Sequence, residues 1–219
     1  MATLAELCPA MPGRHRDHLQ RLMRTWDPLA DISFADLLLC VPADGADVTS
    51  YTVVGHVRPT TSRSIYRTET VGTRFERDAR PFFDVVRTTG SIVDGGLILE
   101  SAAPRIRTLT VPVRCGSDII AVLSREFSPD EQRDPGELEM NYFFTFRRLA
   151  QMIAEGVYPF TADEYEPEES PRVSDGLLLI DASARVRFAS PNAVSVLSRI
   201  GVRGIEGERL SAAGLHNRA

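Results

Sequence analysis

The segment FADLLLCV at residues 34–41 and the segment YTVVGHV at residues 51–57 set up the sheet of this protein. Both are dense in apolar and β-branched residues, which pack well on a pleated surface and favour strands. Ala43, Asp44 and Gly45 lie between them and tolerate a turn. We therefore predict a β-hairpin, with the remaining elements arranged around it.

An amphipathic helix is predicted ahead of the hairpin. Apolar residues recur there at the i, i+3, i+4, i+7 spacing of one helix face: Leu19, Leu22, Met23, Trp26 and Leu29. Pro28 fits poorly inside a helix, but Asp27 and Pro28 suit the N-cap and first position of a new one. We expect a kink near Trp26.

A short helix and three more strands are predicted after the hairpin. Thr73 followed three residues later by Glu76 resembles a capping box for a helix that ends near Gly90. Strand-like density recurs at residues 92–99, 107–113 and 119–125, with a tight turn at residues 114–118. The sheet is then mostly antiparallel.

The strongest helix is predicted at residues 135–155. Asp134 suits its N-cap, Pro135 its first turn and Gly156 its C-cap. The apolar residues of this segment extend beyond one face: Leu138, Met140, Tyr142, Phe143, Phe144, Phe146, Leu149, Met152 and Ile153. An apolar surface that wide indicates two contacts, one with the sheet and one with another helix or subunit.

A linker is predicted at residues 161–172, because its run of acidic residues and prolines repels itself and cannot build a core. A strand at residues 176–180, a strand at residues 185–188 and a helix at residues 192–200 follow. The predicted fold class is α+β. We expect a sensor-sized domain at residues 1–160, the linker, and a smaller module at residues 173–219.

Composition excludes several classes of protein. The chain has 219 residues, with 25 Lys+Arg against 30 Asp+Glu and a formal charge of −5, so a large cationic surface for nucleic acid is not expected. Every basic residue is arginine, which excludes chemistry that needs a P-loop, Schiff-base or kinase ATP-anchoring lysine.

The chain is expected to be cytoplasmic, with no membrane partner. Apolar runs such as residues 37–41 are far shorter than the ~18–20 residues of a membrane-spanning helix. Glu6 precedes every basic residue and no extended apolar core follows, so no secretory signal is predicted. Cys8, Cys40 and Cys115 are widely spaced, which fits reduced thiols better than disulfides.

Three residues are candidates for ligand binding. His56 and Arg58 lie on one side of the predicted strand, as two-residue periodicity requires, and suit the rim of an anion- or nucleotide-binding pocket. The alternative interpretation is the solvent-facing side of a half-buried sheet. Arg74, near the start of the next predicted helix, is a third candidate for a bound phosphate. Arg77 and Arg80 could face the same phosphate, although surface arginine is common in this chain.

No catalytic or metal-binding residue is predicted. The sequence holds no G-x-S-x-G motif and no Ser/His/Asp order typical of a catalytic triad. It holds no C-x-x-C pair, and His15 and His18 lack two further ligands for a metal. An enzyme of another type would need a pocket that gathers His56, Arg58 and a carboxylate around a substrate.

The order of the predicted elements resembles a GAF domain followed by the start of a PAS domain. In their order and spacing, short segments throughout the chain resemble the sensory half of actinobacterial cytosolic histidine kinases of the PdtaS type. The segments are Ser33-Phe34-Ala35-Asp36, Val71-Gly72-Thr73, Ala121-Val122-Leu123, Ala154-Glu155-Gly156, Ser170-Pro171-Arg172, Asp175-Gly176 and Ala189-Ser190-Pro191-Asn192-Ala193.

This resemblance implies the sensory input region of a two-component histidine kinase, which controls autophosphorylation of a C-terminal kinase core absent from this chain. The implied partners are that core, which would use ATP and Mg, and a response regulator of the antiterminator type. The chain alone is then not an enzyme. The residues left after 172 are too few for a PAS module of roughly 100 residues, so that module is expected to be incomplete.

The signal itself is left open between a small-molecule ligand and ligand-free use as a dimerisation scaffold. We expect a symmetric homodimer in which surplus apolar helix surface packs as a bundle. The expected dimer and signal-helix residues are Leu19, Leu22, Trp26, Phe144, Phe146 and Leu149. The alternative function is a stand-alone GAF/PAS ligand-binding regulatory protein without kinase activity.

Overall fold

The computed structural model describes residues 3–43, 48–97, 106–129, 136–160 and 171–211. The chain divides into two compact units, Met1–Ser170 and Pro171–Ala219. Most of the acidic segment predicted as a linker, residues 161–170, lies outside the described residues. Each unit is therefore described by itself.

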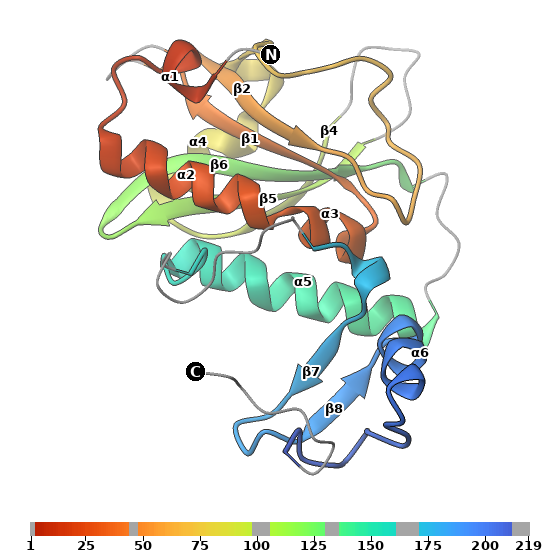
Figure 1. Cartoon of the computed structure of the whole chain (residues 1–219). Coiled ribbons are helices and arrows are strands. Elements are labelled where there is room, and N and C mark those ends of the chain that lie inside the picture. Colours follow the sequence, from red (N-terminus) through yellow and green to blue (C-terminus); the bar gives the residue numbers. More distant parts are fainter. Residues whose placement is uncertain (1–2, 44–47, 98–105, 130–135, 161–170, 212–219) are drawn as a thin grey trace. The chain divides into compact units, whose positions relative to one another are not determined.

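The first unit is built on an antiparallel sheet that has six strands among the described residues, in the order β3-β2-β1-β6-β5-β4 (Figure 1). The strands are β1 (Asp36–Pro42), β2 (Ser50–Val57), β3 (Arg74–Glu76), β4 (Val93–Leu97), β5 (Ile106–Cys115) and β6 (Asp118–Phe127). The predicted antiparallel pairing of β1 and β2 is confirmed, and so are the three later strands, while Asp44 and Gly45 of the predicted turn lie outside the described residues. Strand β6 pairs with β1, which brings the last part of the sheet against the first.

The N-terminal helices are α1 (Leu4–Leu7), α2 (Gly13–Thr25) and α3 (Asp27–Ser33). The predicted kink near Trp26 is confirmed, because α2 ends there and Pro28 lies in the first turn of α3. The Trp26 indole lies against β2 at Gly55, where an added Cβ would be 2.6 Å from the Cη2 atom. The absence of a side chain at Gly55 permits this close approach.

Helix α5 (Glu137–Glu155) packs on the same face of the sheet as α2 and α3, whereas α4 (Pro81–Thr89) covers the opposite face (Figure 1). The predicted caps Asp134 and Pro135 lie outside the described residues, and Gly136 occupies the N-cap of α5. Gly156 ends the helix with φ 78°, as predicted. Within the described ranges, no helix is both long enough and apolar enough to cross a bilayer.

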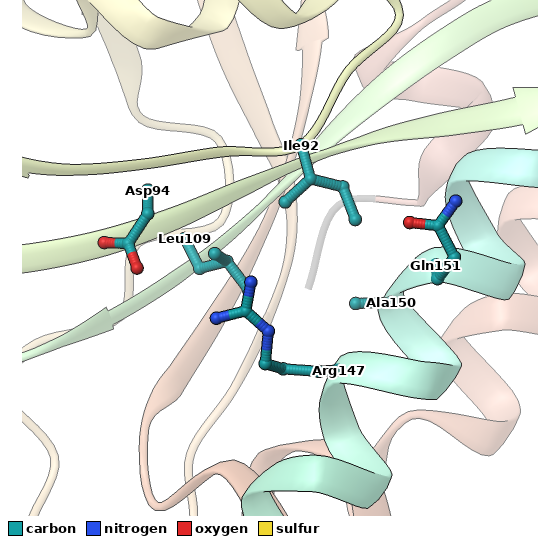
Figure 2. A pocket seen from close by; sticks show the side chains of 6 residues that line it. All are labelled: Ile92, Asp94, Leu109, Arg147, Ala150 and Gln151. Atoms are coloured by element: carbon teal, nitrogen blue, oxygen red, sulfur yellow. The ribbon is translucent and has the colours of Figure 1, made fainter.

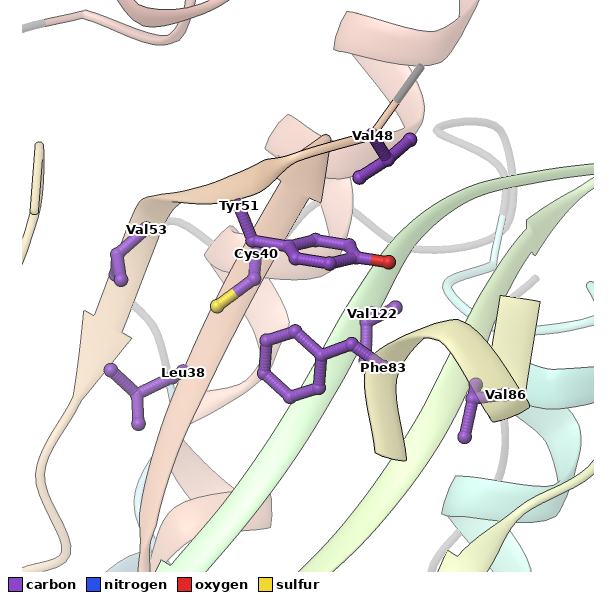
Figure 3. Packing of buried hydrophobic residues seen from close by; sticks show 8 residues of the cluster. All are labelled: Leu38, Cys40, Val48, Tyr51, Val53, Phe83, Val86 and Val122. Carbon is purple, nitrogen blue, oxygen red and sulfur yellow. The ribbon is translucent and has the colours of Figure 1, made fainter. Parts of the chain in front are cut away.

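An apolar core joins α4 to the sheet. Figure 3 shows the buried side chains that form it: Leu38, Cys40, Val48, Tyr51, Val53, Phe83, Val86 and Val122. The rings of Tyr51 and Phe83 meet edge to face with centroids 5.0 Å apart. The Tyr51 hydroxyl donates to Asp84, so the polar end of a buried side chain is satisfied.

The capping box predicted at Thr73 and Glu76 is wrong. Residues Arg74–Glu76 form β3, which pairs with β2, and the 3-10 helix η1 (Arg77–Ala79) separates it from α4. The Val53 amide donates to the Thr73 carbonyl at 2.9 Å, so pairing with β2 satisfies this backbone in an extended conformation.

The second unit contains a hairpin and a helix among its described residues. It comprises η3 (Val173–Asp175), the antiparallel strands β7 (Leu178–Ile180) and β8 (Val186–Ala189), and α6 (Pro191–Arg199). Ser190 caps α6 by accepting a hydrogen bond from the Ala193 amide. A small core of Val186, Ala189, Leu197 and Ile205 holds the helix to the hairpin.

Candidate functional site

Sheet register places polar side chains of four strands on the face that α4 covers. Asp36 of β1 pairs with Glu126 of β6, and Glu126 pairs in turn with Thr108 of β5. The neighbouring row on the same face consists of His56, Leu38, Ser124 and Thr110. The polar residues of these two rows are at most 2% exposed, where for His56 the value is that of its side chain, so this face is both polar and buried. We call these polar residues, with Tyr66 and Arg80, the polar cluster.

Glu126 is at the centre of the polar cluster. Its Oε1 atom accepts from the Ser124 hydroxyl at 2.7 Å, and its Oε2 atom accepts from the Tyr66 hydroxyl. The Arg80 Nη2 atom lies 3.4 Å from the same Oε2 and donates to the Tyr66 oxygen at 3.1 Å. The side chains of Arg80 and Glu126 are 2% and 0% exposed, so water barely screens their attraction.

Burial and charge keep both partners of Glu126 in their hydrogen-bonding forms. Burial, followed by the negative charge of Glu126, raises the pKa of the Tyr66 phenol, which therefore remains a donor. Burial disfavours the charged guanidinium of Arg80, but Glu126 and Tyr66 outweigh burial and raise the Arg80 pKa. The cluster thus holds a permanent buried cation.

Some of the hydrogen-bond donors of Arg80 have no acceptor among the described neighbouring residues. Its guanidinium carbon lies 4.2 Å from the centre of the Phe75 ring, but its Nε and Nη1 atoms are buried with no hydrogen-bond partner among the described residues. The hydroxyls of Thr108 and Thr110 are buried and unpartnered in the same way. An unmade hydrogen bond of this kind costs about 1–3 kcal/mol, so these atoms would gain most from a polar guest.

Asp36 and His56 form a second pair within the polar cluster. The His56 Nε2 atom lies 3.1 Å from Asp36 Oδ1, and the imidazole is only 2% exposed. Asp36 also accepts from the Ser64 hydroxyl at 2.7 Å and the Ile65 amide at 2.8 Å. The His56 and Tyr66 rings meet edge to face, which links the two pairs. Hydrogen bonds from Ser64, Ile65 and Tyr66 to Asp36 and Glu126 therefore hold the segment between β2 and β3 against the sheet.

The structure gives the three residues predicted to bind a ligand different surroundings, but His56 and Arg58 share one acidic neighbour, Glu69. His56 belongs to the polar cluster, so its side chain does not lie on a solvent-facing surface. Arg58 is exposed and donates to the Thr68 carbonyl at 2.8 Å, because β2 ends at Val57 and strand periodicity stops there. Arg74 is exposed on the edge strand β3. One carboxylate, Glu69, interacts electrostatically with both His56 and Arg58, whereas Arg74 lies on β3 at the other end of β2.

Sequence analysis missed Tyr66 and Glu126, and it considered Arg80 only as one of three arginines that could face a phosphate. The available signal was the alternation of polar residues in otherwise apolar strands, Thr108-x-Thr110 in β5 and Ser124-x-Glu126 in β6. Cys40 lies nearby, where burial raises the pKa of its thiol. Within the part of the chain that the structure describes, no three His, Cys, Asp or Glu side chains gather as metal ligands would.

Most of the residues predicted to face a second subunit face the interior of the first unit. Leu19, Leu22, Trp26 and Phe146 are buried in the monomer, which corrects their assignment to a dimer surface. They face inward because α2, α3 and α5 all pack against the sheet or each other. Phe144 is 55% exposed and Leu149 is partly exposed, so these two remain accessible.

A buried arginine connects the sheet to its helices on the α5 face. Arg125 of β6 donates from Nε and Nη2 to the Ser33 carbonyl at the end of α3, at 3.1 and 2.6 Å. Its guanidinium lies 4.1 Å from the Phe127 ring centre and 5.1 Å from that of Phe143 on α5. Burial lowers the pKa of Arg125 to about 10.

A cavity of about 170 Å³ lies between the sheet and α5 (Figure 2). Ile92, Asp94 and Leu109 line it on the sheet side, and Arg147, Ala150 and Gln151 line it from α5. Leu109 lies between Thr108 and Thr110 in β5 and therefore points to the opposite face of the sheet from them. The cavity and the polar cluster are thus separate places on the two faces.

Comparisons with known proteins agree on one family. The family model described as the GAF domain of histidine kinase PdtaS matches residues 1–145. The chain is 32% identical over 219 residues to the sensor histidine kinase PdtaS of Mycolicibacterium smegmatis, covering 97% of this chain and 43% of that protein. The corresponding protein of Mycobacterium tuberculosis is also 32% identical, over 92% of this chain and 41% of its own length.

A solved structure described as the sensor region of a sensor histidine kinase has the same fold. It is 31% identical in sequence, with a TM-score of 0.80, and the match covers 97% of this chain and 74% of that chain. The chain spans less than half the length of the curated relatives that it matches.

Proposed function

Because the chain belongs to the family of PdtaS histidine kinase GAF domains, we propose that it is the sensory input region that controls autophosphorylation of a C-terminal kinase core. The observation that carries this proposal is the likeness to a histidine kinase sensor region over 97% of the chain. The kinase core would use ATP and Mg, and a response regulator of the antiterminator type would accept the phosphoryl group. Both lie outside this chain, and the cytoplasm is the compartment in which they would meet.

The input is a small polar ligand at the polar cluster. The support is the set of buried, unpartnered donors and hydroxyls on Arg80, Thr108 and Thr110. A ligand can shift a conformational equilibrium only by its difference in affinity for two states. A ligand that hydrogen-bonds Arg80 would compete with Tyr66 and Glu126, and would loosen the segment that Ser64 and Tyr66 hold beside the sheet.

Autophosphorylation of the natural full-length protein tests this function. We expect Thr110→Val to keep the fold, because valine has a similar shape, and to change the rate of phosphate incorporation from labelled ATP several-fold. Arg58→Gln is the control, since Arg58 is exposed and lies outside the polar cluster. Equal rates for Thr110→Val and wild type would reject the cluster as the input. Absence of autophosphorylation in any form of the full-length protein would reject the kinase role.

The sensor works as a symmetric homodimer through the exposed strip of α5. Phe144 is 55% exposed, and Met140, one helical turn before it on the same side of α5, is 36% exposed, which leaves an apolar surface on this helix. Phe144→Glu should halve the mass measured by light scattering. Val85→Glu on α4 is the control, because it places the same charge on an exposed apolar residue elsewhere. Unchanged mass for Phe144→Glu would discard this interface.

The domain organisation of the proposal is a GAF domain at residues 1–160, a linker at residues 161–172 and the start of a PAS module at residues 173–219. The hairpin of β7 and β8 followed by α6 supports the last assignment. Ile180, Val194 and Ile200 expose 51%, 47% and 65% of their surface, as expected of a module whose core is partly open.

A further inference from the structure

The cavity between β4, β5 and α5 combines two opposite charges with an apolar wall. Figure 2 shows Asp94 of β4 and Arg147 of α5 around a space that Leu109, Ile92 and Ala150 also line. Among the described residues, Arg147 forms no ion pair with a carboxylate, and its guanidinium lies 5.8 Å from the centre of the Phe143 ring. The residue is exposed, so its donors are open to a guest at the cavity.

Asp94 provides a matching acceptor. Its Oδ1 atom pairs with Arg107 at 3.1 Å, and both side chains of this pair are 53% exposed, so the pair is a weak surface contact. The second carboxylate oxygen makes no contact in that pair. A guest that carries an ammonium group can thus bind Asp94 while its carboxylate binds Arg147.

The size of the cavity limits the guest. Ligand pockets for drug-sized molecules occupy about 300–1,000 Å³, whereas this cavity holds about 170 Å³. Since a water molecule takes about 30 Å³ of liquid volume, the cavity fits a guest of roughly six to eight non-hydrogen atoms. That is the size of an α-amino acid with a short aliphatic side chain.

Electrostatics on this face favour a zwitterion over a simple anion or cation. Arg125, on the same face of the sheet, interacts with both charged residues of the cavity. Burial lowers the pKa of Arg125, the negative charge of Asp94 raises this pKa, and the positive charge of Arg147 lowers it further. A ligand carboxylate on Arg147 would relieve that repulsion, but a bare anion would meet Asp94. A bare cation would meet Arg147.

We propose that this cavity is a binding site for a small zwitterion of the α-amino-acid class, in which Arg147 binds the carboxylate, Asp94 binds the ammonium group, and Leu109 and Ile92 contact the side chain. The site is separate from the polar cluster and its occupancy does not depend on the kinase role. A bound amino acid would connect the edge strand β4 to α5.

Calorimetric titration of the whole chain with alanine and valine tests the proposal. We expect saturable binding of both, and no binding of propionate or isobutylamine, which each lack one charged group. Arg147→Gln and Asp94→Asn should each weaken binding about tenfold, since each removes one charged hydrogen bond to the guest. Arg148→Gln is the control, because Arg148 is the exposed neighbour of Arg147 and does not line the cavity.

A second variant separates loss of the site from loss of the fold. Gln151→Trp fills the cavity from an exposed position and should abolish binding while the circular dichroism spectrum stays unchanged. Thr110→Val, in the polar cluster, should leave amino-acid affinity unchanged. Absence of saturation with both amino acids would overturn the proposal. Equal binding of propionate, or binding that persists in Gln151→Trp, would overturn it as well.

Discussion

Replacing Glu126 with glutamine tests whether water fails to screen the attraction between Glu126 and Arg80 in the polar cluster. Glutamine has nearly the same volume and its carbonyl can still accept a hydrogen bond from Tyr66, so the main change is the loss of a negative charge. Arg80 then keeps a positive charge that is 2% exposed and has no other ion-pair partner among the described residues. Removing one partner of a buried pair costs about 3–5 kcal/mol, whereas a surface pair contributes about 0–1 kcal/mol.

The assay is urea unfolding, followed by circular dichroism and by the fluorescence of Trp26, the one tryptophan of the chain. Coincident transitions support two-state analysis, and a constant slope with urea shows that the unfolded state is unchanged. We expect Glu126→Gln to lower the free energy of unfolding by about 3–5 kcal/mol. The double variant with Arg80→Met should lose less than the sum of the two single variants, by about 0.5–3 kcal/mol.

The exposed pair of Asp94 and Arg107 is the matched control. Both side chains are 53% exposed, so Asp94→Asn should change the free energy of unfolding by less than about 1 kcal/mol. If Glu126→Gln has an effect as small as Asp94→Asn, the charges of the polar cluster are solvated. The inference that Arg80 has unsatisfied donors would then fail too.

Three further predictions concern packing, pH and the two faces of α5. Gly55→Ala places a Cβ 2.6 Å from an indole carbon of Trp26 and should lower the free energy of unfolding by about 1–3 kcal/mol in the same urea assay. Gly13→Ala is the control, because its Cβ meets nothing within 4 Å and the change should be nearly neutral. Equal effects of the two variants would contradict the packing of Trp26 on Gly55. Burial, and then a hydrogen bond to the Asp84 carboxylate, raises the pKa of the Tyr51 phenol to about 12. The stability that Tyr51 contributes is therefore full below its unfolded pKa near 10 and is lost as pH rises through about 12. Tyr51→Phe should make the urea midpoint fall less steeply with pH in this range, and parallel pH curves for the variant and wild type would refute the prediction. Phe146→Glu buries a charge and should abolish the melting transition, while Phe144→Glu should keep it; a normal melt for Phe146→Glu would show that α5 is placed wrongly.

Signals that act over a few residues predicted most of the elements. The pairing of β1 with β2 was predicted from two dense apolar segments that lie close together in the sequence. Pro28 located the break between α2 and α3, and Gly156 located the end of α5, because each residue restricts its own backbone. The same reasoning failed at Thr73, where a local capping pattern lost to pairing with β2.

Periodicity along β6 shows that Ser124 and Glu126 share a face, but it does not show that the face is buried. Burial depends on Tyr66 and Arg80, which come from distant parts of the chain and close over the strand. Contacts of this kind leave no spacing pattern in a sequence, since the residues become neighbours only when the helices and strands pack.

Helix α5 shows the same division. Phe144 and Phe146 are equally apolar and two residues apart, so about 200° of helix rotation separates them. Helical spacing establishes that they point in different directions, and the placement of α5 on the sheet selects which one is buried. Residues that are close in the sequence determine the backbone conformation. Residues that are distant in the sequence determine which side chains are buried, and burial in turn determines how strongly the charged groups of the polar cluster attract one another.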